Sequence, residues 1–366
     1  MNITLNFILL QMSDFFHSFN AVRGTQAGKP CYTAMCPMRI IPKIFVFDEE
    51  EVPAEMRAQR KLNKSRLPEI TNYLLENRND YVLSSLTASI DGDTKFEPID
   101  ESNANIGVFK ISMDASILIN DGQHRRAAIE EAINNNIEIG HDHIPVVFFL
   151  DNGLTKSQQM FADLNKHAVR PSPSLSTLYD RREELSNVAR KVMNGVRIFS
   201  RLTETEKTSV SNRSVKLFTL SSIKNATKSL LSKGKSDSIT DDEVELAIDF
   251  WKAVTEEIKD WTDAYNKKVN SSELRESYVH AHGVFLSAIG ILGNQIITDR
   301  KQWKKLSKLK NIDYSRQSSL WNGRAVVNGR ISKSLTSVKL TSNKIKELIG
   351  LELTDPEKQL EKEINT

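Results

Sequence analysis

Residues 115–134 read ASILINDGQHRRAAIEEAIN, and this stretch decides the fold of the first half of the chain. The apolar run ASILI is typical of a short strand, and the segment from about Arg125 to Asn134 is typical of a helix. Gly122 lies in the polar turn between them and can take backbone angles that a tight turn needs. The stretch therefore predicts a strand, a turn and a helix in direct succession.

The turn itself, NDGQHRRAA at residues 120–128, has the composition of an anion site. A helix N-terminus carries free backbone N–H groups and the positive end of the helix dipole. His124, Arg125 and Arg126 add hydrogen-bonding or cationic side chains at the same point. Two arginines oppose the dipole there, which favours a bound anion. We therefore expect a phosphate site, and the alternative is a common Asp-Gly turn with solvated arginines.

Working outward, the first 170 residues mix strands and helices around one expected sheet. The run IPVVFFL at residues 144–150 is apolar throughout and is typical of a buried strand. Further strands are expected at residues 39–47 (interrupted by Pro42), 81–90 and 106–111, and helices at residues 64–77 and 155–165.

After a proline-containing break at residues 170–174 (RPSPS), the pattern becomes helical throughout. Thr240 and Glu243 form a capping-box pattern ahead of an apolar stripe, which predicts one well-defined helix. Helices are expected at residues 175–195, 217–231, 241–261, 273–297 and 300–308. The sequence thus predicts an α+β protein: an N-terminal extension (1–20) without regular structure, a mixed-sheet domain (21–171) and a mostly α-helical region (172–366).

Positive charge is concentrated near the end of the helical region. Residues 300–346 contain 13 Lys and Arg against one acid, Asp313, a net charge of +12, which leaves −9 for the rest of the chain. Trp303, Tyr314 and Trp321 are interleaved with these cations. Such a segment is the electrostatic footprint of nucleic-acid binding, and the alternative is a solvated face packed against the acidic remainder. We expect DNA contacts from Lys304, Lys305, Arg316, Arg324, Arg330 and Lys333.

Several other classes of protein are not favoured. The two cysteines, Cys31 and Cys36, are too few for a four-cysteine metal site, and we expect two reduced thiols in a loop rather than a redox pair. His141 and His143 have no further ligands nearby in sequence, so no structural metal is expected. The longest apolar stretch, residues 283–297, is too short to span a membrane. We therefore expect a cytoplasmic protein with no membrane segment.

The string DGQHR at residues 121–125 resembles the motif of the DGQHR-domain family. A second string, FADLNKHAVRPSPSL at residues 161–175, is similar to the second motif of that family. The flanking residues 57–60, 64–77 and 321–334 also resemble it, so the likeness covers nearly the whole chain. It is clearest to the DndB-type members, which belong to bacterial DNA sulfur modification systems, where sulfur replaces a non-bridging phosphate oxygen.

The resemblance implies a ParB/sulfiredoxin-like N-terminal fold and a DNA-binding repressor of the modification operon. Its implied partners are double-stranded promoter DNA and other sulfur modification proteins. It further implies a site for ATP or another nucleoside triphosphate with Mg²⁺. The residues that would form this site are Asp121, Gly122, Gln123, His124, Arg125, Arg126, Asn165, Lys166 and Arg170.

Some alternatives stay open at this point. Gln123 stands where sulfiredoxin has its catalytic cysteine, so sulfiredoxin-like chemistry is not expected. An ATP-hydrolysing or DNA-nicking enzyme and a scaffold for other modification proteins are both compatible with the sequence. A homo-oligomer is compatible with it as well.

Overall fold

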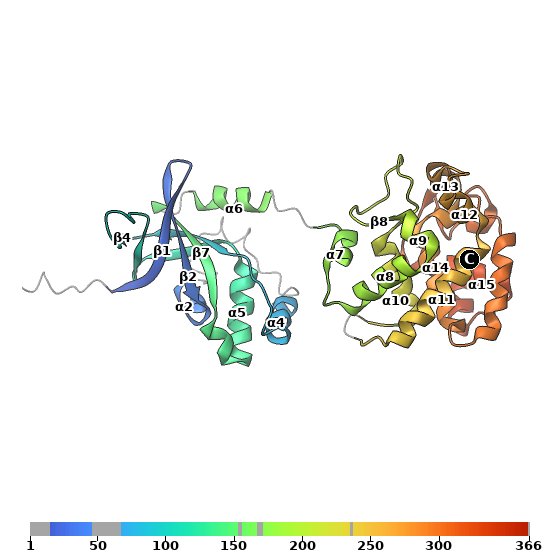
Figure 1. Ribbon diagram of the computed structural model, residues 1–366, viewed down its shortest axis with the longest axis horizontal. Helices are drawn as coiled ribbons and strands as arrows, with labels where there is room; N and C mark the ends of the chain where they lie inside the picture. Colours follow the sequence, from blue (N-terminus) through green and yellow to red (C-terminus); the bar gives the residue numbers. More distant parts are fainter. Residues whose placement is uncertain (1–14, 46–66, 153–155, 167–170, 235–236, 365–366) are drawn as a thin grey trace, which may run out of the picture. The chain divides into compact units, whose positions relative to one another are not determined.

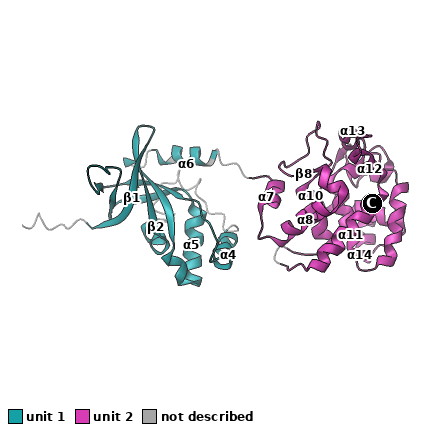
Figure 2. Ribbon diagram, viewed as in Figure 1, with its two compact units in different colours: residues 1–169 teal, residues 170–366 magenta. Residues whose placement is uncertain are grey.

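The computed structural model describes residues 15–45, 67–152, 156–166, 171–234 and 237–364. The chain forms two compact units, residues 1–169 and residues 170–366 (Figure 2). Each unit has a hydrophobic core of its own.

Unit 1 is built around a seven-stranded mixed sheet (Figure 1). Its strands are β1 (Phe16–Gln26), β2 (Lys29–Pro37), β3 (Leu86–Asp91), β4 (Thr94–Pro98), β5 (Ile106–Ser112), β6 (Ser116–Asp121) and β7 (His143–Leu150). The order across the sheet is β4-β5-β1-β2-β7-β3-β6. Strands β3 and β7 pair in parallel, and the other neighbours pair antiparallel.

Helices cover the two faces of this sheet unequally. The elements are η1 (Met38–Ile40), α2 (Ile41–Ile44), α4 (Leu67–Glu76), α5 (Gln123–Asn135), η3 (Ile137–His141) and α6 (Ser157–Lys166). Alternate residues of β3 and β6, such as Ala88 and Ile119, join Ile129 of α5 in the core. Helix α6 packs on β6, and its Met160 contacts Ser89 of β3.

Two predictions for the start of unit 1 were wrong. Residues 38–44 are helical rather than a strand because Met38, Ile41 and Ile44 recur at every third residue and all face the core. Residues 46 and 47 of the expected strand lie outside the described residues. Pro42 lies in the first turn of α2, where its missing N–H costs nothing. The segment of Cys31 and Cys36 is not a loop but strand β2, because a two-residue turn joins it to β1.

That hairpin is closed by Ala27 and Gly28, whose φ angles are +49° and +74°. Both angles match the turn type that follows the twist of a hairpin. Alanine is uncommon at the first of these positions, so the sequence carries no clear signal for the turn. The strand expected at residues 81–90 also begins later than expected, at Leu86.

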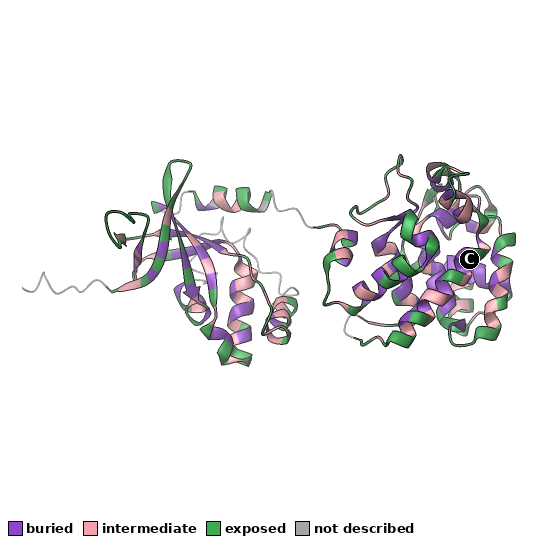
Figure 3. Cartoon of the chain, in the orientation of Figure 1, coloured by how far each residue is buried: buried purple, intermediate pink, exposed green. Residues whose placement is uncertain are grey.

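Unit 2 is mostly helical, as expected, and its helices surround a core that contains the buried Trp251, Trp261 and Trp321 (Figure 3). Its helices are α7 (Pro173–Tyr179), α8 (Glu184–Gly195), α9 (Arg197–Leu202), α10 (Leu220–Leu231), α11 (Asp241–Glu257), α12 (Lys259–Tyr265), α13 (Ser271–Ser277), α14 (Gly283–Ile296), α15 (Leu335–Ile349) and α16 (Asp355–Ile364). Short 3-10 segments are η5 (Val279–Ala281), η6 (Arg300–Asn311) and η7 (Ser319–Trp321), and two-residue strands are β8 (Thr203–Glu204), β9 (Phe218–Thr219), β10 (Val326–Val327) and β11 (Arg330–Ile331).

Several long helices expected in unit 2 are divided. The range 175–195 is split between α7 and α8, 241–261 between α11 and α12, and 273–297 between α13, η5 and α14. At one break Ile258 has φ −107° and ψ 92°, which are extended angles, and its side chain is buried. Because Ile258 is apolar and buried, it fits the spacing expected of a continuous helix, so the sequence does not indicate a break at this position.

Candidate functional site

The turn between β6 and α5 requires glycine at position 122. Gly122 is the N-cap of α5 with φ +107°, and no side chain caps the helix there. A Cβ at this position would lie 2.3 Å from Cδ2 of Leu86. The strand, turn and helix are therefore confirmed, and the first turn of α5 is left without a side-chain cap.

The polar side chains of the DGQHR motif hold this turn in place. Gln123 donates from Nε2 to the carbonyl oxygens of Ile119, at 3.1 Å, and Asn120, at 3.4 Å. Arg125 donates to the Asp121 carboxylate at 2.7 Å and to the carbonyl oxygen of Ser85 at 3.0 Å. The motif thus joins the end of β6 to the segment that leads into β3.

Arg126 is 8% exposed and ties α5 to α2. It donates to the Glu130 carboxylate at 2.6 Å and to the carbonyl oxygen of Pro42 at 2.9 Å. Neither arginine of the motif is therefore a solvated side chain. Because Asp121 and Glu130 balance their charges, the groups at the turn best placed to attract an anion are the first backbone N–H groups of α5 and the half-buried His124.

A buried polar cluster lies behind the turn and brings α6 against β6. The fully buried Asn120 donates to Oγ of Ser89 at 2.6 Å and accepts a hydrogen bond from Oγ of Ser157, also at 2.6 Å. Met160 contacts the same amide. Ser89 and Ser157 lie 31 and 37 residues from Asn120, so no local pattern in the sequence points to them.

The second motif begins at Phe161, within α6. Because α6 packs on β6, the strand that ends in the first motif, the two motifs lie close together. Lys166 is the last residue of α6 and its side chain is exposed. Arg170 and the side chain of Asn165 lie outside the described residues, as do the flanking residues 57–60 and residues 1–14 of the expected N-terminal extension. Residues 16–20 of that extension belong to strand β1, so they do have regular structure.

The basic segment, residues 300–346, is divided between structural and exposed cations. Arg300, Arg324, Lys344 and Lys346 pair with Asp249, Glu361, Glu347 and Glu357. Within the part of the chain that the structure describes, the other nine cations form no ion pair. They are Lys301, Lys304, Lys305, Lys308, Lys310, Arg316, Arg330, Lys333 and Lys339.

Four lysines among these nine cations are exposed along η6, at positions 301, 304, 308 and 310, while Leu306 and Leu309 anchor the element in the core. Lys305 on the same element is half-buried. Arg330 follows the turn of Asn328 and Gly329, whose φ angles are +51° and +72°. The side chains of Arg330 and Lys333 are exposed.

The aromatic residues among these cations belong to the core. Trp321 is fully buried and donates from its indole to the carbonyl oxygen of Asp313 at 2.8 Å. Tyr314 is also buried, and Trp303 packs against Phe250. Trp321 and Tyr314 are therefore not accessible for stacking on nucleic-acid bases.

The two cysteines are reduced and buried. Burial raises the pKa of the Cys36 thiol to about 12, so this thiol stays protonated and unreactive at neutral pH. Among the described residues no group of His, Cys, Asp and Glu is arranged to hold a metal ion, and no helix there is long and apolar enough to cross a membrane.

An α+β chain with a glycine-dependent DGQHR turn and a basic helical unit matches one family model over residues 19–352. That family is DndB, described as DNA-sulfur modification-associated. The chain belongs to this family and is therefore associated with DNA sulfur modification. No match was found among curated proteins or solved structures, so the ParB/sulfiredoxin-like likeness stays a prediction.

Proposed function

We propose that this protein is a DNA-binding regulator of the DNA sulfur modification operon. The observation that carries the proposal is the set of nine cations within residues 300–346 that have no ionic partner among the described residues. Each cation that meets a backbone phosphate releases counterions, which is the main source of sequence-independent affinity for DNA.

The proposed DNA surface includes five of the six residues expected from the sequence. Lys304, Arg330 and Lys333 are exposed, and Lys305 and Arg316 are half-buried. Arg324 is left out because its guanidinium is held by Glu361 through two hydrogen bonds, at 2.8 and 2.6 Å. The exposed Lys301, Lys308 and Lys310 on η6 are added to the surface.

The test is a fluorescence-anisotropy titration of duplex DNA from the operon promoter. Replacing Lys301, Lys304 and Lys308 by Gln removes three positive charges, and we expect DNA affinity to fall by about ten- to hundredfold at physiological salt. The matched control replaces three exposed lysines elsewhere in unit 2, Lys207, Lys228 and Lys259, by Gln. Equal affinities of the two variants would contradict the proposed surface.

We also propose that the DGQHR turn binds the phosphate of a nucleoside triphosphate with Mg²⁺. The observation that favours it is the start of α5, which has no side-chain cap and is formed by a glycine that admits no Cβ. A helix N-terminus of this kind binds phosphate through its backbone N–H groups.

Calorimetry with ATP, CTP and GTP in the presence of Mg²⁺ tests this second proposal. His124→Ala should weaken binding, whereas His141→Ala, at an exposed position on η3, should not. Phosphate release in the same samples distinguishes a regulator that holds nucleotide from the ATP-hydrolysing alternative. If the wild-type protein binds no triphosphate, the turn has a structural role alone.

A further inference from the structure

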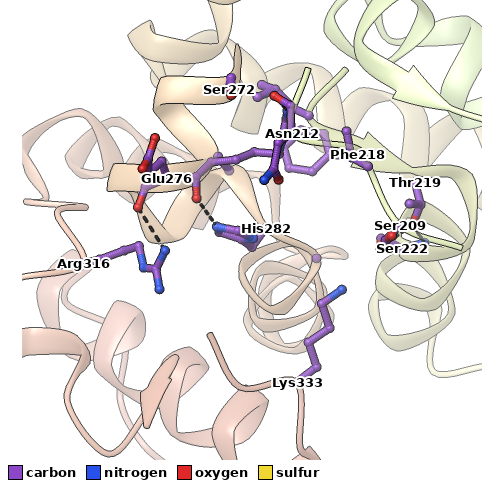
Figure 4. Close-up of a pocket in the computed structure, with 15 residues that line it drawn as sticks. Ser209, Asn212, Phe218, Thr219, Ser222, Ser272, Glu276, His282, Arg316 and Lys333 are labelled. Atoms are coloured by element: carbon purple, nitrogen blue, oxygen red, sulfur yellow. Dashed lines mark hydrogen bonds between the residues drawn. The ribbon is translucent and has the colours of Figure 1, made fainter. Parts of the chain in front are cut away.

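Unit 2 contains a cavity of about 400 Å³ that none of the sequence motifs indicates (Figure 4). It lies between the segment around residues 209–222, the segment 272–283, and the side chains of Arg316 and Lys333. Hydroxyl groups line part of it, from Ser209, Thr219, Ser222 and Ser272. Its volume is in the range of pockets that bind small ligands.

The charged lining of this cavity is mostly positive. Arg275 is nine-tenths buried and donates to the carbonyl oxygens of Lys216, Ser211, Asn212 and Ser214. All of these partners are neutral, so they satisfy its hydrogen bonds without balancing its charge.

Arg316 is held in a similar way, by the carbonyl oxygens of Glu276, at 2.9 Å, and Gly329, at 3.1 Å. Lys333 directs its amine toward the space between His282 and the hydroxyl-bearing residues (Figure 4). Neither these two cations nor Arg275 forms an ion pair within the described ranges, and Glu276 is the one acid in the lining. Of the three, Arg275 is buried, and a buried charge without a counter-charge is costly. An anion in the cavity would supply that counter-charge.

Two helix dipoles add to this positive potential. The N-caps of α10 and α14, Thr219 and His282, both line the cavity. His282 makes no side-chain hydrogen bond to the helix it precedes, so the first N–H groups of α14 are left without a side-chain cap. The two helices therefore direct their positive ends at the same space.

Glycines of α14 allow this arrangement. A Cβ on Gly283 would lie 2.6 Å from Oγ of Ser222, one on Gly290 would lie 2.2 Å from the carbonyl oxygen of Ala226, and one on Gly293 would lie 2.6 Å from Leu230. The contacts advance in the same direction along both helices, so α10 and α14 pack in parallel. Parallel dipoles repel each other, and an anion at their shared N-terminal end would offset that repulsion.

The pKa of His282 is consistent with this positive potential. Its Nε2 lies 2.7 Å from the carbonyl oxygen of Arg275, so it donates there. Burial lowers the pKa of His282 to about 4, and the charges of Arg316, Lys333 and Arg275 add to the lowering. The imidazole is thus neutral at pH 7, first because it is largely buried and second because a fourth positive charge beside these three is unfavourable.

We propose that this cavity binds the phosphate group of a phosphorylated ligand, either a free mononucleotide-sized phosphate ester or one phosphate of a DNA strand. The proposal goes beyond the DNA surface described above, because it concerns a pocket and depends on Arg275 and two helix N-termini outside the basic segment. Arg316 and Lys333 belong to both sites, and for that reason the test uses small probes.

The experiment is calorimetry of the full-length protein with inorganic phosphate and with deoxyadenosine 5′-monophosphate at millimolar concentrations. We expect both to bind the wild-type protein. Lys333→Gln changes an exposed side chain, and Arg316→Gln/Lys333→Gln removes two charges. Loss of charge-assisted hydrogen bonds should weaken binding about tenfold or more. The control Lys228→Gln/Lys259→Gln removes two charges from exposed positions of unit 2 outside the cavity lining and should leave phosphate binding unchanged.

Folding of each variant is checked by its thermal transition without ligand, and Lys333→Gln keeps the test valid if the double variant is unstable. Competition of a short DNA duplex against phosphate then identifies the source: displacement indicates a DNA phosphate, and no displacement indicates a free phosphate ester. The proposal is overturned if neither small probe binds the wild-type protein, or if Lys333→Gln and the double variant bind as the wild type does. Variants that lose DNA affinity but bind phosphate as the wild type does would also overturn it, and would leave Arg316 and Lys333 with a role on the DNA surface alone.

Discussion

At the residue scale, Gly122 decides whether strand β6 can turn directly into α5. Its φ of +107° is unfavourable for other residues, and Leu86 occupies the space that a Cβ would need. The sequence predicted this glycine correctly because a positive-φ turn has a local signature. It could not predict the backbone partners of Arg125 and Arg126, because the carbonyl oxygens of Ser85 and Pro42 belong to residues far away along the chain.

We therefore expect Gly122→Ala to destabilise the protein by about 2–4 kcal/mol, from backbone strain together with overpacking against Leu86. Gly28→Ala is the matched control, since Gly28 also has a positive φ but has open space around its Cα. It should cost about 1 kcal/mol. Urea unfolding of both variants measures the difference, and equal losses would mean that the contact with Leu86 contributes nothing.

Cys36 should be inert in the folded protein. Its thiol is fully buried and its pKa is raised to about 12, so a thiol-specific reagent at pH 8 should label it only after unfolding in urea. Because the thiol of the unfolded chain ionises near pH 8.5, this group favours the folded state below that pH and the contribution is lost as pH rises toward 12. Rapid labelling of native protein at Cys36 would contradict the burial.

At the element scale, the C-terminal helix α16 is held to α15 and to the turn before β10 by ionic contacts. Glu361 accepts two hydrogen bonds from Arg324 and one from Asn343, at 2.9 Å. Burial alone would raise the pKa of Glu361, but the hydrogen bonds from Arg324 and Asn343 outweigh it and hold the pKa below its usual value. Arg324, expected from the sequence to contact DNA, thus has a structural role.

Removing this carboxylate by Glu361→Gln should cost about 3 kcal/mol, because the charge of Arg324 is then left largely buried without its partner. The exposed pair of Lys344 and Glu347 gives a control, and Glu347→Gln should change stability by about 0.5 kcal/mol or less. Since the pKa of Glu361 is lowered in the folded state, its contribution is present above about pH 4.3 and is lost as pH falls below that value. Thermal unfolding of both variants across pH 3–7 measures these losses of stability. Equal losses for Glu361→Gln and Glu347→Gln at every pH would contradict the structural role of Glu361.

Elements with local signals were predictable, and elements without them were not. The capping box of Thr240 and Glu243 begins α11 as expected, and β7 is a buried strand as its apolar run indicates. The β1–β2 hairpin has no clear local signal because its turn is Ala-Gly. The apolar residues of segment 38–44 are spaced by three but also resemble the continuous run of a strand, so the sequence there favours the wrong element.

At the scale of the whole molecule, the two units have separate cores, and the basic segment belongs to unit 2. The concentration of positive charge in residues 300–346 could be predicted from the sequence, because it depends only on which residues are present. The cavity was not, because its lining comes from segments between Ser209 and Lys333 that only the packing of α10 against α14 brings together.

A fragment that begins at residue 171 should therefore fold alone and retain most of the DNA affinity of the full chain. Circular dichroism and a cooperative thermal transition would establish folding, and anisotropy would measure affinity. A folded fragment without DNA affinity would place the main DNA contacts in unit 1.

The most direct measurement of the central claim is the salt dependence of DNA binding. If about six of the nine unpaired cations contact phosphates, log K for the wild-type protein should fall against log salt with a slope near −5. Replacing Lys301, Lys304 and Lys308 by Gln should make that slope less steep by about 3, whereas the Lys207, Lys228 and Lys259 control should keep the wild-type slope. An unchanged slope in the Lys301, Lys304 and Lys308 variant would contradict the claim that this segment binds DNA.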